Sequence, residues 1–311
     1  MDLSEALAKI IEGQTLSQAN TKAVFDTIMA GEATPAQIAG ILMALRVRGE
    51  SPEEIAGAAE AMRQVSTKVV VDVPNLVDTC GTGGSAGAKL FNVSTAAAFV
   101  VAGAGGHVAK HGNRGMTSRS GSADLLEAAG VNIALTPEQI ARCIEEIGVG
   151  FLFAQAHHSA MRHAGPIRQE LRVRTIFNLL GPLTNPAGAE RQLIGVFAPE
   201  WQLPVAEVAK LLGSTHVMVV HANGLDELSI SGTSNVVELK NDEIRQYAIE
   251  PEDFGMTTRT VESLHADSPT RSLELVRQSL SGDDTTGAAN IVALNAGAAI
   301  YVAGIVETLA H

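Results

Sequence analysis

Cysteine is scarce in this sequence. The 311 residues include two cysteines, Cys80 and Cys143, and they do not form a metal-binding motif. A chain of this length can bury a sizeable core without disulfide bonds, and a low cysteine content fits a reducing compartment. We therefore expect a cytoplasmic protein whose fold does not depend on disulfides.

Long hydrophobic runs are also missing. The longest run, Ala96 to Gly106, is about half as long as a membrane-spanning helix must be. The acidic N-terminus lacks the basic, apolar and cleavage regions of a signal peptide. These absences predict a soluble, unprocessed protein with no membrane partner.

Positively charged residues are also scarce relative to acidic residues. The chain has 22 Lys and Arg against 34 Asp and Glu, a net charge of -12, which argues against a nucleic-acid partner. The excess of acidic residues is unevenly distributed along the chain. Ser85 to Ala123 contains no acidic residue, and Gly148 to Ala189 contains only Glu170. The cations of these stretches include Lys89, Lys110, Arg114, Arg119, Arg162, Arg168, Arg172 and Arg174. They predict a site for a small polyanion; chance clustering on solvated loops is the alternative.

Two patterns of secondary structure divide the chain. Residues 3 to 65 carry apolar side chains at spacings of three and four, which predicts helices. After the β-branched stretch Ser66 to Val73, short apolar strands alternate with helices, a pattern typical of βαβ units. We expect an α/β fold with a small N-terminal helical domain (1–68) and a large α/β domain (69–311), whose mostly parallel sheet is flanked by helices.

Individual elements of the larger domain can be placed from the same patterns. A turn at Lys240 to Glu243 predicts a hairpin and an antiparallel edge, and Asn290 to Leu309 reads as an Ala-rich helix. The parallel strands are expected near residues 76–80, 107–110, 150–154, 192–197 and 216–221, and the helices between them near 94–104, 137–147 and 203–212.

A glycine turn follows the first expected strand. It reads Gly81-Thr82-Gly83-Gly84, and Phe91 to Thr95 then opens a helix. Glycines let backbone N–H groups approach phosphate oxygens, and a helix N-terminus adds partial positive charge. The pattern indicates a phosphate site, with a tight turn that binds no ligand as the alternative.

A second motif begins where the next strand ends. Lys110 to Arg114 reads KHGNR, and Thr117 to Ser122 adds hydroxyls, a cation and a glycine. Ligands of open α/β sheets bind at the carboxyl ends of strands, and Lys and Arg are suited to pyrophosphate. The motif favours a pyrophosphate cradle over a solvated surface loop.

Two later segments complete the pattern: Arg174 to Pro186 (RTIFNLLGPLTNP) and Gly224 to Glu227 (GLDE). In this order and spacing, the segments resemble the anthranilate phosphoribosyltransferase family, which has the glycosyltransferase family 3 fold shared with nucleoside phosphorylases. The resemblance implies transfer of the 5-phosphoribosyl group from PRPP to the amino group of anthranilate in tryptophan biosynthesis. It also implies a cleft between the two domains and a homodimer, and it leaves open a contact with anthranilate synthase.

The resemblance assigns roles to matching positions. It makes Lys110, Arg114 and His111 the catalytic candidates, although His111 is equally well explained as a structural histidine. Anthranilate binding falls to Gly81, Asn113 and Arg168, and Mg²⁺ binding to Ser94, Asp226 and Glu227. The PRPP-binding positions are Gly81, Gly84, Ser85, Asn92, Ser94, Thr95, Lys110, Asn113, Arg114, Ser118 and Ser122.

The sequence departs from the family pattern in places. Ser85 stands where the family has Asp, and the loop from Gly81 to Thr95 is one residue longer than usual. Metal use or loop closure could be altered by these changes, and a degenerate homologue is one alternative. The others are a nucleoside phosphorylase and a non-catalytic nucleic-acid-binding relative, which Lys110 to Arg114 and the net charge respectively oppose.

Overall fold

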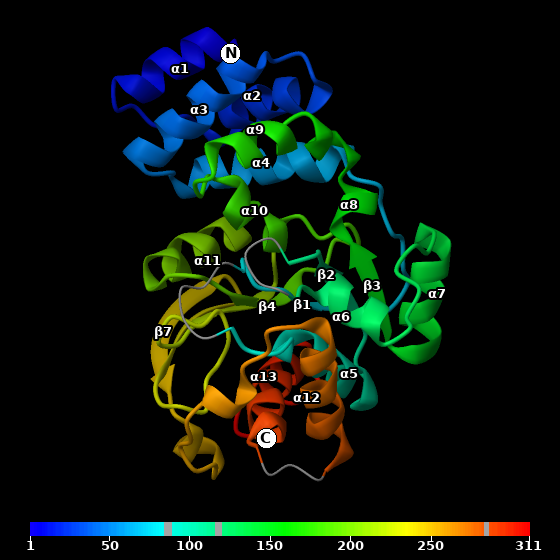
Figure 1. The fold of residues 1–311 in the computed structure, drawn as a ribbon. Helices are drawn as coiled ribbons and strands as arrows, with labels where there is room; N and C mark the ends of the chain where they lie inside the picture. Colours follow the sequence, from blue (N-terminus) through cyan, green and yellow to red (C-terminus); the bar gives the residue numbers. More distant parts are fainter. Residues whose placement is uncertain (84–88, 116–119, 283–285) are drawn as a thin grey trace.

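The computed structural model describes residues 1–83, 89–115, 120–282 and 286–311. Within these ranges no helix combines the length and the apolar character needed to cross a membrane. Figure 1 shows a layer of N-terminal helices, then a sheet, then a second layer of helices that contains the C-terminus.

Four N-terminal helices form the first layer: α1 (Leu3–Ile11), α2 (Gln18–Ala30), α3 (Pro35–Arg48) and α4 (Pro52–Val65). Their starts follow from local chemistry. Thr34 and Ser51 each cap the following helix in a reciprocal capping box, and a proline occupies the first turn of both helices, where its missing N–H has no cost. The expected helical domain is therefore confirmed.

One mixed sheet lies at the centre. Within the described residues it has seven strands in the order β3-β2-β1-β4-β5-β6-β7. The strands β1 to β5 pair in parallel, whereas β6 and β7 are antiparallel. Their bounds are β1 (Val77–Thr79), β2 (Val108–Gly112), β3 (Val149–Phe153), β4 (Arg191–Gly195), β5 (His216–His221), β6 (Ser234–Lys240) and β7 (Glu243–Ile249). The predicted α/β class and mostly parallel sheet are confirmed.

Both faces of the sheet are covered, because successive side chains of a strand point to opposite faces. In β5, Val217 and Val219 pack with the N-terminal helices and α11, whereas Met218 and Val220 pack with α5 and α13. The helices of the α/β part are α5 (Val93–Gly103), α6 (Ser122–Ala128), α7 (Pro137–Ile147), α8 (Ala154–His157), α9 (Gly165–Leu171), α10 (Phe177–Leu183), α11 (Gln202–Leu211), α12 (Pro269–Ser281) and α13 (Ala288–Val302).

The antiparallel edge and the last helix test two local expectations. β6 and β7 are joined at Asn241 and Asp242, which both have positive φ angles (53° and 66°), as a two-residue hairpin requires. The helix expected to reach Leu309 instead ends at Val302. Gly304 has a φ of 74°, a left-handed conformation that ends helices, so that part of the expectation was wrong.

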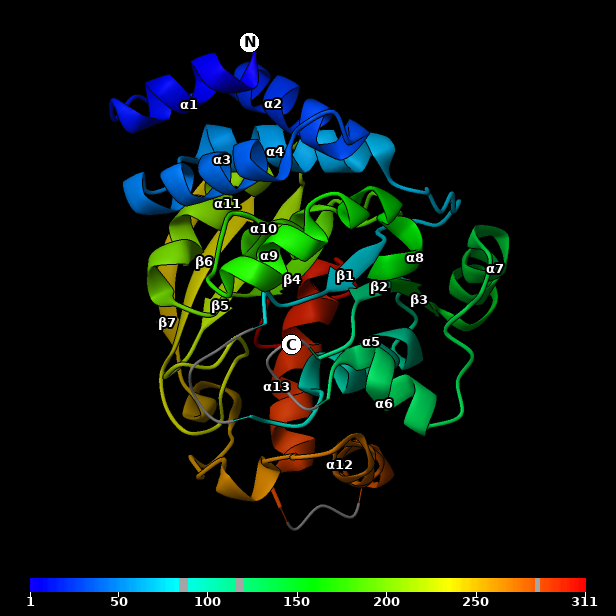
Figure 2. The same cartoon turned by 45° about the horizontal axis from the view of Figure 1, so that its top comes forward.

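The helical layer is not built from the N-terminus alone. α9 packs against α3, and α10 packs against α4; in Figures 1 and 2 α9 lies beside the N-terminal helices. One apolar cluster joins Phe25 and Leu42 of this layer to Ile167 of α9 and Ile194 of the sheet. The boundary at residues 68 and 69 marks a change in the sequence pattern. Because α9 and α10 also belong to the helical layer, the division of the structure into two domains at this boundary stays a prediction.

Glu54 is the polar centre of the helical layer and provides a test of its stability. Its side chain is 0% exposed and accepts hydrogen bonds from the amides of Leu16 (2.8 Å) and Ser51 (2.9 Å) and from the Arg48 guanidinium. Glu54→Ala leaves these buried donors without a partner, so we expect the free energy of unfolding to fall by about 3 kcal/mol.

Urea denaturation measures this loss. Glu53→Ala is the matched control, because Glu53 is the exposed neighbour in the same helical turn, and it should change the free energy of unfolding by less than about 0.5 kcal/mol. Equal effects of the two substitutions would contradict the role assigned to Glu54.

Candidate functional site

The carboxyl ends of the parallel strands meet at one edge of the sheet. The chain runs from β1 to β2 and β3 on one side, and returns to β4 and β5 on the other. Open α/β sheets bind ligands at the carboxyl edge where the strand order reverses in this way. The glycine turn follows β1 and Asp226-Glu227 follows β5 at this edge. The KHGNR motif was expected to begin where its strand ends, but Lys110 to Gly112 form the last three residues of β2, and only Asn113 and Arg114 follow the strand.

The glycine turn packs closely against Asp226. A Cβ atom at Gly81 would lie 2.7 Å from Asp226 Oδ2, and one at Gly195 would lie 1.6 Å from the Asp226 carbonyl oxygen. The amide of Gly83 donates a hydrogen bond to Asp226 Oδ2 at 3.0 Å. Glycine at the ends of β1 and β4 therefore lets the carboxylate segment reach the turn.

Lys110 is buried within β2, with 4% of its surface exposed. Its ammonium donates to the Thr79 carbonyl oxygen and to Ser94 Oγ, the latter at 3.3 Å. The positive charge also opposes the rise in pKa that burial causes at Asp78 and Glu227. A buried cation requires such partners, so this arrangement holds a positive charge beside the N-terminus of α5.

Asp226 and Glu227 are half-buried beyond β5. Burial, followed by the repulsion of Asp226, raises the pKa of Glu227 to about 8, and hydrogen bonding to the Ser94 backbone opposes the rise. A divalent cation would relieve this repulsion, and Mg²⁺ prefers hard oxygen ligands. The predicted ligands Ser94, Asp226 and Glu227 therefore fit that ion.

Another group of donor atoms lies nearby but does not suit Mg²⁺. Single ligand atoms of Asp78, Cys80 and His111 lie within 4.8 Å of one another. The Asp78 carboxylate already accepts hydrogen bonds from the His111 amide (3.1 Å) and Asn185 Nδ2 (2.8 Å). Burial raises the pKa of the Cys80 thiol, which keeps it protonated and unreactive. This group ties β1 to β2 and to the segment that contains Asn185.

His111 is 3% exposed. Its Nδ1 lies 3.0 Å from the Gly181 carbonyl oxygen, so Nδ1 carries the proton, and Nε2 has no hydrogen-bond partner among the described residues. Burial, followed by the nearby His158 ring at 5.2 Å, lowers the pKa of His111 to about 3. The imidazole is therefore neutral near pH 7, and a catalytic role for it stays a prediction.

Arg114 is paired with two carboxylates of α6. Its guanidinium lies 2.5 and 2.8 Å from the two Glu127 oxygens and 3.2 Å from Asp124 Oδ1. Arg114 and Glu127 are exposed whereas Asp124 is half-buried, and exposed ion pairs contribute only about 0–1 kcal/mol. The cost of separating Glu127 from Arg114 is therefore low.

Asn113 and Ser122 meet between the end of β2 and the start of α6. The Asn113 carbonyl oxygen accepts hydrogen bonds from Ser122 Oγ (3.4 Å) and the Ala123 amide (3.2 Å). Asn113 Oδ1 accepts from the Arg114 amide (2.8 Å) and from Gln155 Nε2 (3.3 Å). These contacts join two of the predicted PRPP-binding residues.

Arg168 comes from the helical layer and not from the sheet. It lies on α9, and its guanidinium stacks over the Phe177 ring at 5.2 Å. Burial lowers its pKa, and it has no ion-pair partner within the part of the chain that the structure describes. A half-buried guanidinium without a counter-ion suits a carboxylate ligand.

The start of α5 contains the remaining described candidates. The Asn92 side chain contacts Ser120 and Ser272, and Thr95 Oγ1 is buried with no hydrogen-bond partner in the described ranges. The predicted PRPP-binding residues Gly84, Ser85 and Ser118 lie outside the described residues.

Several residues that shape the site were missed by sequence reasoning. Asp78 and Asn185 could have been found, because Asp78 is a polar residue three positions before Gly81 and Asn185 lies within the motif RTIFNLLGPLTNP. Glu127 and Ser272 had no such signal, since their partners Arg114 and Asn92 are distant in sequence and the pairing depends on tertiary structure.

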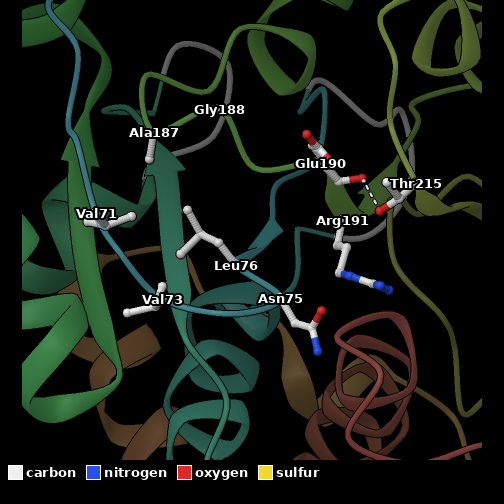
Figure 3. Close-up of a pocket in the computed structure, with 9 residues that line it drawn as sticks. All are labelled: Val71, Val73, Asn75, Leu76, Ala187, Gly188, Glu190, Arg191 and Thr215. Atoms are coloured by element: carbon white, nitrogen blue, oxygen red, sulfur yellow. Dashed lines mark hydrogen bonds between the residues drawn. The ribbon is translucent and has the colours of Figure 1, made fainter.

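Two hollows in the described surface are not lined by the candidate residues themselves. One, of ≈580 Å³, is lined by Pro166, Gln169, Glu170 and Arg172 around α9. The other, of ≈310 Å³, is shown in Figure 3; its lining residues Leu76, Arg191 and Thr215 adjoin the amino ends of β1, β4 and β5. That edge is opposite to the candidate site.

The chain matches two family models that together cover most of its length. The helical bundle domain of a glycosyl transferase family matches residues 4–66, and the a/b domain of a glycosyl transferase family matches residues 73–311. These matches agree with the two-part architecture of the fold.

The similar proteins and solved structures compared with this chain are anthranilate phosphoribosyltransferases. Anthranilate phosphoribosyltransferase from Marinomonas sp. is 56% identical over 100% of this chain and 90% of its own length, and that from Teredinibacter turnerae is 56% identical over 99% and 92%. The crystal structure of the Thermus thermophilus enzyme superposes with a TM-score of 0.93 at 47% identity, covering 98% of this chain and 91% of that one. The Saccharomyces cerevisiae enzyme in complex with PRPP and Mg has a TM-score of 0.88 at 25% identity, covering 99% and 90%. This chain therefore belongs to the anthranilate phosphoribosyltransferase family.

Proposed function

We propose that this protein transfers the 5-phosphoribosyl group of PRPP to the amino nitrogen of anthranilate, releasing pyrophosphate and supplying tryptophan biosynthesis. The observation that carries the proposal is the buried ammonium of Lys110, which donates to Ser94 at the start of α5 and acts electrostatically on Glu227 beyond β5. Membership of the family and the likeness to a relative in complex with PRPP and Mg support it.

The reaction breaks the bond between the anomeric carbon and pyrophosphate while the amine attacks that carbon. Negative charge grows on the leaving group, so fixed positive groups at this point lower the barrier. Lys110 is already held rigidly by Thr79 and Ser94. Arg114 would add a second cation after exchanging Glu127 for the pyrophosphate.

The acceptor requires orientation more than deprotonation. An aromatic amine has a free lone pair and becomes acidic only after its nitrogen has been alkylated. We assign Arg168 to the anthranilate carboxylate, with Asn113 and Gly81 placing the ring, because Arg168 has no other counter-ion in the described structure. Bringing the two reactants into this geometry is itself a large part of catalysis. His111 is a weak base for the late proton, because burial and the neighbouring His158 lower its pKa to about 3.

The use of Mg²⁺ is proposed mainly from the similarity to a relative in complex with PRPP and Mg. Ser94, Asp226 and Glu227 would hold Mg²⁺, which neutralises pyrophosphate charge when it is bound. The homodimer and the contact with anthranilate synthase are also proposed from the family resemblance, and they stay predictions.

The fluorescence of anthranilate gives a direct test of the reaction. Mixing the protein with PRPP, anthranilate and MgCl₂ should deplete the fluorescence, and omitting PRPP or adding excess EDTA should stop the loss. No depletion at any Mg²⁺ concentration would contradict the proposed transferase activity and leave a degenerate homologue as the explanation.

Arg168→Ala tests the assignment of the acceptor site. Loss of a charge-assisted pair to the carboxylate should raise the KM for anthranilate by about 100-fold, while the KM for PRPP should change by less than about three-fold. Arg142→Ala is the matched control, because Arg142 is an exposed arginine of α7 paired with Glu146. An unchanged KM for anthranilate in Arg168→Ala would exclude Arg168 as the carboxylate partner.

A further inference from the structure

Asn92 joins three parts of the chain at the start of α5. Its Oδ1 accepts hydrogen bonds from Ser120 Oγ (2.9 Å) and Ser272 Oγ (2.7 Å), and its Nδ2 donates to the Ser120 carbonyl oxygen (3.3 Å). Its backbone amide donates to Ser272 Oγ at 3.0 Å. The Ser272 hydroxyl therefore acts as both donor and acceptor toward one residue.

These bonds replace the usual cap of the helix. Asn92 occupies the N-cap position of α5, but its side chain makes no capping hydrogen bond to the helix. An N-cap asparagine normally bonds to the second or third helical amide. Because the amide group of Asn92 is committed to Ser120 and Ser272, the position of this helix start depends on residues outside it.

The segment before α12 runs beside the chain that leads into α5. The Phe91 amide donates to the Leu264 carbonyl oxygen and the Ala266 amide donates to the Lys89 carbonyl oxygen, both at 3.0 Å. α12 begins shortly afterwards at Pro269 and packs against α5, α6 and α13. Figures 1 and 2 both show α12 on the same side of the sheet as these helices.

Ser272 is 0% exposed, so it lies beneath the site. Its neighbours on the buried face of α12 include Leu275 and Val276, and an apolar residue would fill such a position equally well. A buried hydroxyl is tolerated only when it is hydrogen-bonded, and among the described residues Ser272 Oγ bonds to two atoms of Asn92, its backbone nitrogen and its Oδ1.

We propose that Ser272 is a positioning residue for PRPP: from α12 it fixes Asn92, and through Asn92 it sets the start of α5 against the segment that precedes α6. The inference rests on the proposed function, since PRPP is the ligand expected at these two helix starts. Ser94, which contacts Lys110 and Glu227, lies two residues after Asn92, so a shift of Asn92 would also move those contacts.

Ser272→Ala tests the proposal, with Ser279→Ala as the matched control. Both serines are buried on α12, but the Ser279 hydroxyl donates within the helix, to the Val276 carbonyl oxygen at 2.8 Å. Removing the Ser272 hydroxyl leaves the backbone N–H of Asn92 without its acceptor and removes one donor to Asn92 Oδ1. The KM for PRPP should therefore rise about ten-fold. The KM for anthranilate should stay within about two-fold in both variants, and the KM for PRPP should stay within that range in Ser279→Ala.

Steady-state kinetics at saturating Mg²⁺ are measured below the thermal midpoint of each variant. A purely structural role would lower the midpoint without a selective change in the KM for PRPP, and that result would overturn the proposal. If Ser272→Ala does not fold, Ser120→Ala removes the other hydroxyl donor to Asn92, and an unchanged KM for PRPP in that variant would overturn it equally. Wild-type protein that consumes no anthranilate would refute the proposed function itself, so the two failures are distinguishable.

Discussion

The buried ammonium of Lys110 is the constraint on which the rest of the site depends. A cation without solvent is stable only where oxygen atoms surround it, and here they come from the end of β1 and the start of α5. Two carboxyl groups, Asp78 and Glu227, face the same charge from β1 and from the segment beyond β5. A single side chain of β2 therefore joins the end of β1 to the start of α5, and its charge also acts on the carboxyl group of Glu227 beyond β5.

The second constraint connects the sheet to the helical layer. Asn185 donates to Asp78 and to the Ala109 carbonyl oxygen, both at 2.8 Å, and Gln192 Nε2 donates to the Pro182 carbonyl oxygen at 2.6 Å. These bonds secure the end of α10, whose Phe177 supports Arg168 of α9. A rigid link of this kind sets the distance between an acceptor held by the helices and a donor held by the strand ends, and such distances govern bimolecular catalysis.

Much of this organisation could be predicted from the sequence, because it depends on local patterns. Alternating apolar strands gave the parallel sheet, and the turn before Glu243 gave the hairpin. The motifs also placed the glycine turn and the Lys110 segment at the carboxyl ends of neighbouring strands, and the structure has both at that edge of the sheet. Gly304 shows the limit of such reasoning, since its left-handed conformation ends the last helix within an otherwise apolar, helix-like pattern. The pairs Arg114–Glu127 and Asn92–Ser272 could not be foreseen, because each joins residues on different elements through packing that no periodicity encodes.

A crystal structure of this protein with PRPP and Mg²⁺ would test the account most directly. The account predicts pyrophosphate density beside Lys110 and the start of α5, the metal between that density and Asp226-Glu227, and Arg114 released from Glu127 to face the phosphates. PRPP bound elsewhere, for example in the hollow at the amino edge of the sheet, or density at the predicted edge with Lys110 making no contact to it, would contradict the account.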